Sequence, residues 1–470
     1  MVALQITLDQ VKHLTEQVHG HATVLSPDSE GYGRSLERWS DIGFQRPGVV
    51  ISPKDAQGIA MTVRFAKDHY IDLAVKGGGH ATHNASTSDG GILVDLRLMN
   101  RVHVDIGAKT VAVQGGALWA DVSRETARYK LAVVGGTASQ VGVGGLTLSG
   151  GYGYLTPQHG LALDSLISAN VITGGGTELK VSAEQNPDLF WAIRGAGPNV
   201  GVVEEFIFRA YAQPNLVWYG KRSYPSSEVP RVVDALNRAL VHPQGKAAAQ
   251  CVLSLSPDDG ATPIVTTILF FNGCEKEARR HFSQLLDFEC VMEQLEMTPY
   301  SETNTILDPL VPPGGRKKIL GFQMAPPVQP EFVSGLMENI HRKLTNESDL
   351  AKSALEIDFF DPTEVCRTSN AETAFPARHK LLNAALMLQW ADPSNDEDFF
   401  SWGASIQSLC EDELRRQGYK PNHRVSNFIG YTQATARDMF GANADRLLSI
   451  KAKYDPANVF HKLNPLDRIL

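Results

Sequence analysis

The sequence predicts an α+β protein built in two large parts, with a short third segment closing the chain. The first 210 residues are rich in glycine and in short apolar runs of strand length, interrupted by helical patterns. Near residue 212 the glycine clusters end, and paired strand-like and helix-like runs follow to about residue 420. The pattern changes once more in the last 50 residues. We therefore expect three regions, 1–212, 213–420 and 421–470.

In the first region, short strands dominate. Helices are expected over 56–63, where apolar residues recur at helical spacing, from Ala117, and behind Pro187, because proline favours a helix start. A strand–helix–strand unit followed by a cluster of strands is typical of a mixed α/β or α+β domain. The expected strands are 48–52, 71–75, 92–96, 102–106, 110–114 and 169–173.

The second region has the pattern of an antiparallel sheet flanked by helices. Its Pro/Gly-rich run VPPGGRKK, at 311–318, is typical of a surface loop. A further helix is expected at 444–453, in the closing segment. The expected strands of the second region are 249–255, 263–271, 354–361 and 379–390, and its expected helices are 274–287, 330–343 and 396–416.

Composition argues against several classes of protein. A hydrophobic fraction of 43% over 470 residues fits a globular protein with a large core. The net charge of −8 argues against a nucleic-acid-binding surface, and no apolar run approaches the roughly 18 residues that span a bilayer. The N-terminus lacks the pattern of a secretory signal. All five cysteines lie beyond residue 250 without metal-like spacing, so we expect buried reduced thiols and a cytoplasmic location.

Two glycine-rich stretches are the candidates for a binding site. The run KGGGHATHN at 76–84 places three glycines at the exit of a buried strand, and eight glycines fall within 133–153. Glycine lets the backbone approach a ligand closely, but glycine clusters also mark turns and strand crossings, and His80 could simply end such a turn. A third run, 194–201, is close to a dinucleotide fingerprint, but its spacing carries an extra residue and a strand follows it, so a Rossmann motif does not fit.

Seven ordered segments resemble the vanillyl-alcohol oxidase superfamily, and in particular its berberine-bridge-enzyme-like FAD-linked oxidoreductases with a PCMH-type FAD-binding domain. The branch includes fungal secondary-metabolite enzymes. The segments are Gly78–His80, 90–100, 113–122, 141–153, 160–176, 186–206 and 454–460.

The resemblance implies a fold and a cofactor. Residues 1–212 would hold FAD between two α+β subdomains, residues 213–420 would form a substrate-binding α/β domain, and 421–470 would return to the FAD domain. His80 would be bonded to the 8α-methyl carbon of the flavin, and glycine N–H groups would surround the pyrophosphate. The residues implied for cofactor binding are Lys76, Gly77, Gly78, Gly79, His80, Thr82, His83, Gln114, Gly115, Gly116, Gly136, Val141, Gly142, Gly144, Gly145, Gly151, Tyr152, Val203 and Asn427.

The chain departs from the family pattern at three positions. Ala138 stands where many relatives attach the flavin a second time through cysteine, so a single link is expected, as in 6-hydroxy-D-nicotine oxidase. Leu146 replaces a histidine that often contacts the flavin, and Val425 replaces a tyrosine that assists proton removal, while Asn427 is retained. Val141 matches the small residue that the family associates with oxygen access.

The function that the resemblance implies is an FAD-dependent oxidase. It would move a hydride from a small, secondary-metabolite-like organic substrate to FAD and then to O₂. A redox-neutral isomerase or cyclase and a non-catalytic flavin-binding protein are the alternatives, and a sugar oxidase is disfavoured by Ala138. The catalytic base is open, with candidates Tyr152, Tyr154, His379, Gln389, Asn427 and Tyr431, and also Glu356 and Asp358.

Other partners are not expected. His83 lies three residues from His80, but no third metal ligand accompanies the pair, so we expect no metal site. We also expect neither a nucleic-acid nor a membrane partner, and a monomer or homodimer.

Overall fold

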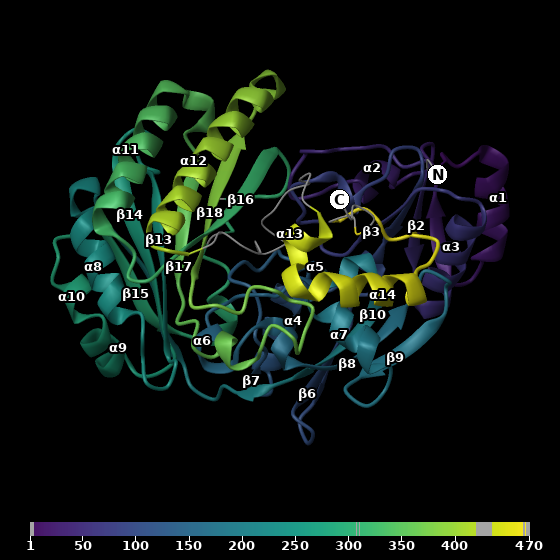
Figure 1. The fold of residues 1–470 in the computed structure, drawn as a ribbon, viewed down its shortest axis with the longest axis horizontal. Helices are drawn as coiled ribbons and strands as arrows, with labels where there is room; N and C mark the ends of the chain where they lie inside the picture. The colour runs from purple at the N-terminus through teal and green to yellow at the C-terminus, as the bar shows by residue number, and fades with distance from the viewer. Residues whose placement is uncertain (1–3, 307, 310, 420–434, 464–465, 467–470) are drawn as a thin grey trace.

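The computed structural model describes residues 4–306, 308–309, 311–419, 435–463 and 466 of the chain. Two lobes lie side by side in Figure 1, and each is built around its own sheets. The first lobe contains residues up to 212 together with the C-terminal helices, and the second contains residues 217–416. The mixture of helices and sheets confirms the predicted α+β class.

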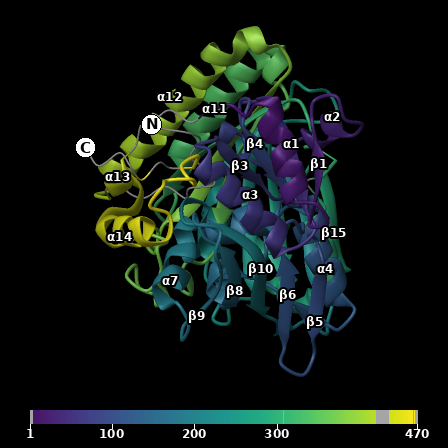
Figure 2. The same ribbon diagram turned by 90° about the vertical axis from the view of Figure 1, so that its right-hand side faces the viewer.

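The first lobe begins with a four-stranded sheet in the order β1-β2-β4-β3. Strands β2, β4 and β3 are parallel, and β1 pairs antiparallel with β2. Helices α1 and α3 begin at the side-chain caps Thr7 and Asp55 and pack beside this sheet (Figure 2). The elements are α1 (Leu8–Gln17), β1 (Ala22–Leu25), α2 (Tyr32–Ser35), β2 (Val49–Pro53), α3 (Ala56–Asp68), β3 (Leu73–Lys76) and β4 (Ile92–Asp95).

A five-stranded antiparallel sheet, in the order β5-β6-β10-β8-β9, completes the sheets of this lobe. A two-stranded pair, β7 with β11, lies beside it. The elements are β5 (Val102–Asp105), β6 (Thr110–Gln114), α4 (Trp119–Ala127), β7 (Leu131–Ala132), α5 (Val143–Leu148), α6 (Thr156–His159), β8 (Leu166–Ile172), β9 (Glu178–Ser182), α7 (Pro187–Ala196), β10 (Val202–Arg209) and β11 (Tyr211–Ala212).

The second lobe is a seven-stranded antiparallel sheet with helices packed on one face. Side chains alternate along its strands: Leu355 and Ile357 face the helices, whereas Glu356 and Asp358 face the first lobe. The strands are β12 (Val217–Pro225), β13 (Ala247–Leu255), β14 (Pro263–Phe271), β15 (Met292–Thr298), β16 (Arg316–Met324), β17 (Ala354–Phe359) and β18 (Leu382–Trp390). The helices are α8 (Val229–Ala239), α9 (Glu275–His281), α10 (Ser283–Leu286), α11 (Pro330–Asn346) and α12 (Asp396–Arg416).

The chain returns to the first lobe through α13 (Ala436–Phe440) and α14 (Ala444–Tyr454), and α14 packs beside α7 (Figures 1 and 2). The buried ammonium of Lys451 fixes this return, because it donates to the backbone carbonyl oxygens of Asn199 (2.8 Å) and Phe460 (2.7 Å) and to the Asp455 carboxylate. The segment from Asp455 to Phe460 is thereby held against the first lobe.

An apolar cluster joins the two lobes. In its centre Tyr154 stacks on Phe270, with ring centroids 5.2 Å apart, and its hydroxyl lies 3.1 Å from that of Tyr219. Packing of this kind fixes the lobes relative to each other because interiors are close-packed. The buried members are Ala132, Val134, Tyr154, Leu155, Val217, Tyr219, Ala248, Ile268, Phe270 and Phe360.

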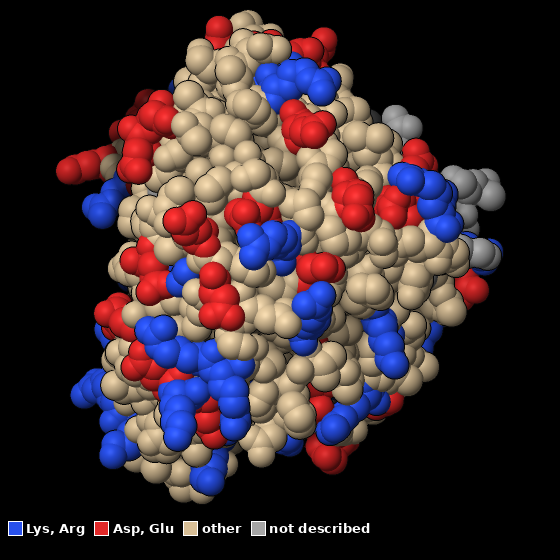
Figure 3. Space-filling model, turned by 90° about the vertical axis from the view of Figure 1, so that its left-hand side faces the viewer, with Lys and Arg blue, Asp and Glu red and all other residues tan. Residues whose placement is uncertain are grey.

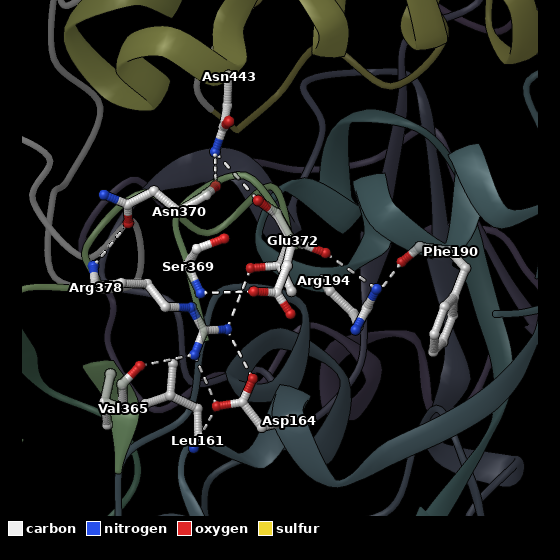
Figure 4. A network of polar contacts seen from close by, with 11 residues as sticks. Leu161, Asp164, Phe190, Arg194, Val365, Ser369, Asn370, Glu372, Arg378 and Asn443 are labelled. Carbon is white, nitrogen blue, oxygen red and sulfur yellow. Dashed lines mark hydrogen bonds and ion pairs between the residues drawn. The ribbon is translucent and has the colours of Figure 1, made fainter. Parts of the chain in front are cut away.

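A polar network ties the connection between β17 and β18 to the first lobe (Figure 4). Arg378 donates to both carboxylate oxygens of Asp164, at 2.9 and 2.7 Å, and its side chain is 1% exposed. Asn443, just before α14, donates to the carbonyl oxygen of Asn370 at 2.7 Å. The network thus joins the second lobe to both the first lobe and the C-terminal helices.

Three expectations about single elements were wrong. The helix predicted over 274–287 is two helices, because the backbone turns at Phe282, whose buried ring stacks on Trp218. The predicted surface loop at 311–318 is partly buried: Val311 is 7% and Lys317 1% exposed, because this segment packs on the first lobe. Cys274 is exposed rather than buried, since it stands at the start of α9 on the outside of the sheet.

The helical face of the second lobe carries a mixed charge. Acidic and basic side chains are interspersed over it in Figure 3. Lys343 on α11, for example, lies 2.8 Å from the Asp398 carboxylate on α12. Among the described residues, no helix is both long and apolar enough to cross a membrane.

Candidate flavin site

A cavity of about 860 Å³ lies between the lobes. Glycine-rich segments of the first lobe form one wall, and the inward face of strands β13, β14, β17 and β18 forms the opposite wall. The C-terminal residues Phe460, Lys462 and Leu463 also reach it. The two glycine-rich stretches singled out in the sequence therefore meet at one site.

Direct contact between two glycines holds these stretches together. A Cβ atom on Gly78 would lie 2.5 Å from the Cα of Gly142, so no other residue fits at this crossing. The next residue, Gly79, has a φ of +71°, which favours glycine as well. The result is a backbone surface without side chains, on which N–H groups can contact a pyrophosphate.

His80 follows directly and lies against an aromatic ring. Its imidazole stacks on Trp39 at a centroid distance of 4.1 Å and an interplanar angle of 16°. Its Nε2 is buried and has no hydrogen-bond partner among the described residues. Burial, and then the neighbouring Lys317 ammonium, lowers the pKa of His80 to about 3. The imidazole is therefore neutral at physiological pH, with a nitrogen free to bind or react.

These features fit FAD. A buried nitrogen without a partner and a glycine surface beside it are what a covalently held dinucleotide needs. Most of the residues predicted to bind FAD do line the cavity, which supports their roles without testing them. These residues are Gly77, Gly78, Gly79, His80, Thr82, His83, Gly115, Gly136, Val141, Gly142, Gly144, Gly145, Gly151, Tyr152 and Val203.

Other predicted cofactor residues lie away from the cavity. Lys76 is 1% exposed and forms an ion pair with Asp95 at 3.3 Å. Gln114 donates to the Glu204 carboxylate, and Gly116 packs against the backbone of Leu96. These contacts stabilise the loops behind the cavity. Asn427, together with Val425 and the candidate Tyr431, lies outside the described residues.

His83 serves the local backbone. Its Nδ1 accepts a hydrogen bond from the N–H of Ala85 at 3.2 Å, and burial lowers its pKa to about 4. In the described part of the chain, no three His, Cys, Asp or Glu residues are grouped as metal ligands.

The opposite wall carries a pair of half-buried carboxyl groups. Glu356 and Asp358 are two residues apart on β17 and so share the cavity face. Gln250 on β13 uses its side-chain N–H₂ group to donate to both, at 3.0 Å to Asp358. Tyr154 fixes the orientation of this amide by donating to its Oε1 at 2.8 Å. Any reversal of the amide would set its oxygen against two carboxyl groups.

This environment favours protonation. Burial, and then the adjacent Asp358, raises the pKa of Glu356 well above its ordinary value. Burial also raises the pKa of Asp358. Two neighbouring carboxyl groups cannot both ionise easily, so the pair shares one proton. It can accept a second proton from a group in the cavity.

The other candidate catalytic residues differ in their access to the cavity. Tyr152 lines it, and burial raises its pKa to about 12, so it is a hydrogen-bond donor at neutral pH. Gln389 also lines it. Tyr154 lies behind the wall, where burial raises its pKa, and His379 is not among the lining residues. The roles predicted for these four residues remain predictions.

Sequence reasoning missed Trp39, Gln250 and Lys317. Trp39 lies in an irregular segment, Gln250 sits in an apolar strand pattern, and Lys317 belongs to the run interpreted as a surface loop. Only Gln250 had a local signal, since it is a polar residue that interrupts the apolar pattern of its strand.

Comparison with known proteins gives two family matches. Residues 47–182 match the family described as FAD binding domain, and residues 427–465 match the family described as berberine and berberine like. The first match contains both glycine stretches and His80. Fold and cavity thus define an FAD-binding flavoprotein.

The chain is similar over nearly its whole length to named flavoenzymes. It is 28% identical to the FAD-linked oxidoreductase pgmH of Aspergillus terreus, covering 97% of this chain and 96% of that protein. It is also 28% identical to (R)-6-hydroxynicotine oxidase of Paenarthrobacter nicotinovorans, with coverage of 94% and 96%. A crystal structure of 6-hydroxy-D-nicotine oxidase from Arthrobacter nicotinovorans superposes with a TM-score of 0.80 at 26% identity, over 95% of this chain and 98% of that one.

A second solved structure shows how widely the fold is shared. Physcomitrella patens BBE-like 1 gives a TM-score of 0.83 at 19% identity, over 98% of this chain and 99% of that one. The predicted resemblance to berberine-bridge-enzyme-like flavoenzymes is confirmed, and the chain is an FAD-dependent oxidoreductase whose predicted cofactor, FAD, is confirmed as well.

Proposed function

We propose that this protein is an oxidase of small organic, secondary-metabolite-like molecules, with FAD bonded to His80 and O₂ as the electron acceptor. When bound, the flavin supplies hydride acceptance and delivery of electrons to oxygen. The observation that carries the proposal is the cavity itself. It has a neutral histidine and a glycine surface on one wall, and a proton-accepting carboxyl pair on the other.

The carboxyl pair is the proposed base. An oxidation of an alcohol or amine releases a proton from O–H or N–H as hydride leaves the adjacent carbon. The pair of Glu356 and Asp358 can take this proton, and Gln250 holds both side chains in place through its amide. Tyr152, protonated at neutral pH, can donate a hydrogen bond to the substrate oxygen or nitrogen.

Two further residues support the single attachment and the use of oxygen. Ala138 lines the cavity at the position where a second, cysteinyl link would require a thiol, and the described lining residues include no cysteine. Val141 also lines the cavity and leaves more space than a leucine would.

We further propose that the chain divides into three regions, 1–212, 213–420 and 421–470, and that the protein is a monomer or a homodimer.

Anaerobic mixing tests the function directly. Purified protein is combined with candidate amines and alcohols under argon, and flavin absorbance is followed. An oxidase loses its flavin absorbance on mixing and recovers it, with release of hydrogen peroxide, when air is admitted. Turnover without loss of absorbance would instead indicate the redox-neutral isomerase or cyclase, which the relatives named as oxidases do not favour. Flavin absorbance that changes with none of the candidate substrates, together with no turnover, would indicate a non-catalytic flavin-binding protein.

A further inference from the structure

The surroundings of His80 are built from segments far apart in the sequence. Residues 38–43 lie between the His80 segment and residues 311–319 of the second lobe. The Trp39 N–H donates to the carbonyl oxygen of Gly79 at 2.9 Å. The indole N–H donates to the carbonyl oxygen of Val311 at 3.1 Å. Trp39 therefore contacts both lobes while it stacks on the imidazole.

Lys317, the second residue of β16, holds Trp39 from the second lobe. Its ammonium donates to the carbonyl oxygen of Trp39 at 3.1 Å and also to that of Gly314. The same nitrogen lies 5.0 Å from the centre of the indole ring, within reach of a cation–π interaction. Ser40 adds two hydrogen bonds to the Lys317 backbone, at 2.7 and 3.2 Å. The backbone N–H, the carbonyl oxygen and the indole N–H of Trp39 thus all have hydrogen-bond partners.

A buried ammonium at this place is costly for stability. Lys317 is 1% exposed, and its charge is met by carbonyl dipoles, by an aromatic face and by the Asp41 carboxylate nearby. An apolar side chain of similar length would fill the space without the cost of desolvating a charge. The position of this charge next to Trp39 and His80 gives a reason for its presence.

We propose that Trp39 and Lys317 are positioning residues for the covalent attachment of FAD to His80. This inference rests on the proposed attachment. Stacking on Trp39 fixes the plane of the imidazole at the cavity wall, and Lys317 fixes Trp39. Because Lys317 belongs to the second lobe, attachment is completed only after that lobe has docked onto the first.

Attachment forms one bond and breaks two. A nitrogen of His80 bonds to the 8α carbon of the flavin, one C–H bond of that methyl group breaks, and the imidazole loses its N–H proton. Two electrons remain on the flavin, and O₂ removes them with two protons as hydrogen peroxide. Correct alignment of nitrogen and carbon controls the rate of such a step, and a displacement of about 1 Å can cost on the order of a hundredfold.

The experiment measures covalent attachment rather than turnover. Full-length Lys317→Met, Trp39→Leu and Trp39→Phe variants are purified with their flavin and incubated with added FAD. The fraction of flavin that stays with the acid-precipitated polypeptide is followed over time. In Lys317→Met and Trp39→Leu, attachment should slow on the order of 10- to 100-fold, while total bound flavin stays near the wild-type level. Trp39→Phe keeps a ring to stack on His80 and should attach close to the wild-type rate.

Lys343→Met is the matched control. Lys343 also lies over an aromatic ring, 5.4 Å from the centre of Phe399, but on the outer helical face of the sheet. The Lys343→Met variant should attach flavin at the wild-type rate. If Lys317→Met fails to fold, the attachment rates of the two Trp39 variants still test the inference.

Wild-type rates in Lys317→Met and Trp39→Leu would overturn the inference, and so would a Trp39→Phe variant as slow as Trp39→Leu. Wild-type protein whose flavin is fully released by acid would instead refute the attachment at His80 itself. The two failures are therefore distinguishable.

Discussion

Glu356 and Asp358 form the most sharply defined chemical group in the cavity. Both carboxyl groups are bound by one amide, from Gln250, and both have raised pKa values because they are buried. The pair carries at most one negative charge near neutral pH. A base of this kind can take a proton from a substrate without a permanent buried charge on each group.

Removal of the base should slow substrate oxidation. Asp358→Asn keeps the shape and one hydrogen bond but loses the proton-accepting oxygen, so anaerobic flavin reduction should slow about 100- to 10,000-fold. Glu356→Gln should have an effect in the same direction. Glu296→Gln, on the exposed edge strand β15 of the same sheet, is the control and should react like wild type. Wild-type reduction rates in Asp358→Asn would mean that the base is another group.

The raised pKa values also predict an acid limb in the pH profile. Above its raised pKa the pair carries one negative charge and can accept a proton, whereas below it both groups are protonated and the base is lost. Thus kcat/KM should fall as the pH is lowered, beginning above the ordinary carboxyl pKa of about 4. Steady-state rates across the acid range measure this limb. A profile flat down to that value would contradict the assignment.

At the residue scale, the sequence indicated more of the glycine-rich wall of the cavity than of the wall formed by the second lobe. His80 and the glycines are contiguous or nearly so, and a family pattern marks them. Trp39 contacts His80 across 41 positions, Gln250 contacts Glu356 across 106 and Lys317 contacts Trp39 across 278, and no local pattern records such contacts. The two acidic residues on one strand face were candidates, but only the structure places Gln250 between them.

The crossing of the two glycine loops is the element on which the cavity floor depends. A Cβ at Gly78 would meet Gly142 at 2.5 Å, backbone against backbone, so Gly78→Ala must push the loops apart. Overpacking of this kind costs about 1–3 kcal/mol. FAD binding should therefore weaken on the order of tenfold or more, as measured by the flavin content of purified protein and by titration with FAD.

Gly335→Ala is the matched control for this substitution. Gly335 lies within α11, and a Cβ there meets nothing within 4 Å. The alanine should leave FAD binding unchanged and stabilise the helix by roughly 0.5–1 kcal/mol. Equal flavin content in Gly78→Ala and Gly335→Ala would show that the close crossing does not matter.

At the element level, the sequence predicted that a helix or strand exists better than it predicted where that element begins and ends. Amphipathic spacing identifies α3, α11 and α12, since their apolar stripes pack on sheets. The pattern over 274–287 hides the break at Phe282 because burial of that ring, and not helix propensity, decides the local backbone. The Pro/Gly-rich 311–318 run looked exposed because the lobe that covers it is remote in sequence.

The two lobes are held together by an apolar cluster and by a charged network. Arg378, on the connection between β17 and β18, is bidentate to Asp164 in the first lobe, and the pair is almost fully buried (Figure 4). The same connection contacts α7, where the Phe375 N–H donates to the Arg194 carbonyl oxygen at 3.0 Å. Docking of the lobes therefore shapes the cavity between them.

Breaking the charged network should loosen the whole molecule. Arg378→Met leaves the Asp164 carboxylate buried without its cation, which should lower the unfolding free energy by about 3–5 kcal/mol. Thermal unfolding of the flavin-loaded protein, followed by circular dichroism, measures the change. Arg367→Met removes an arginine from the same connection whose side chain is 73% exposed, and it should shift the transition little. Equal shifts for both variants would refute a special role for Arg378.

The overall α+β class was within reach of the sequence, because the short apolar runs and the helical patterns that predict it recur as strands and helices in the fold. The docking of the two lobes could not be predicted from the sequence, because it depends on side chains such as Tyr154 and Arg378 that contact residues remote in the chain.

The attachment of FAD to His80 is the central claim, and mass spectrometry of the tryptic peptide 77–97 tests it most directly. The peptide from wild-type protein should carry the flavin on His80, and the same peptide from His80→Ala should be unmodified while FAD is still bound without a covalent link. An unmodified His80 peptide from yellow wild-type protein would contradict the account.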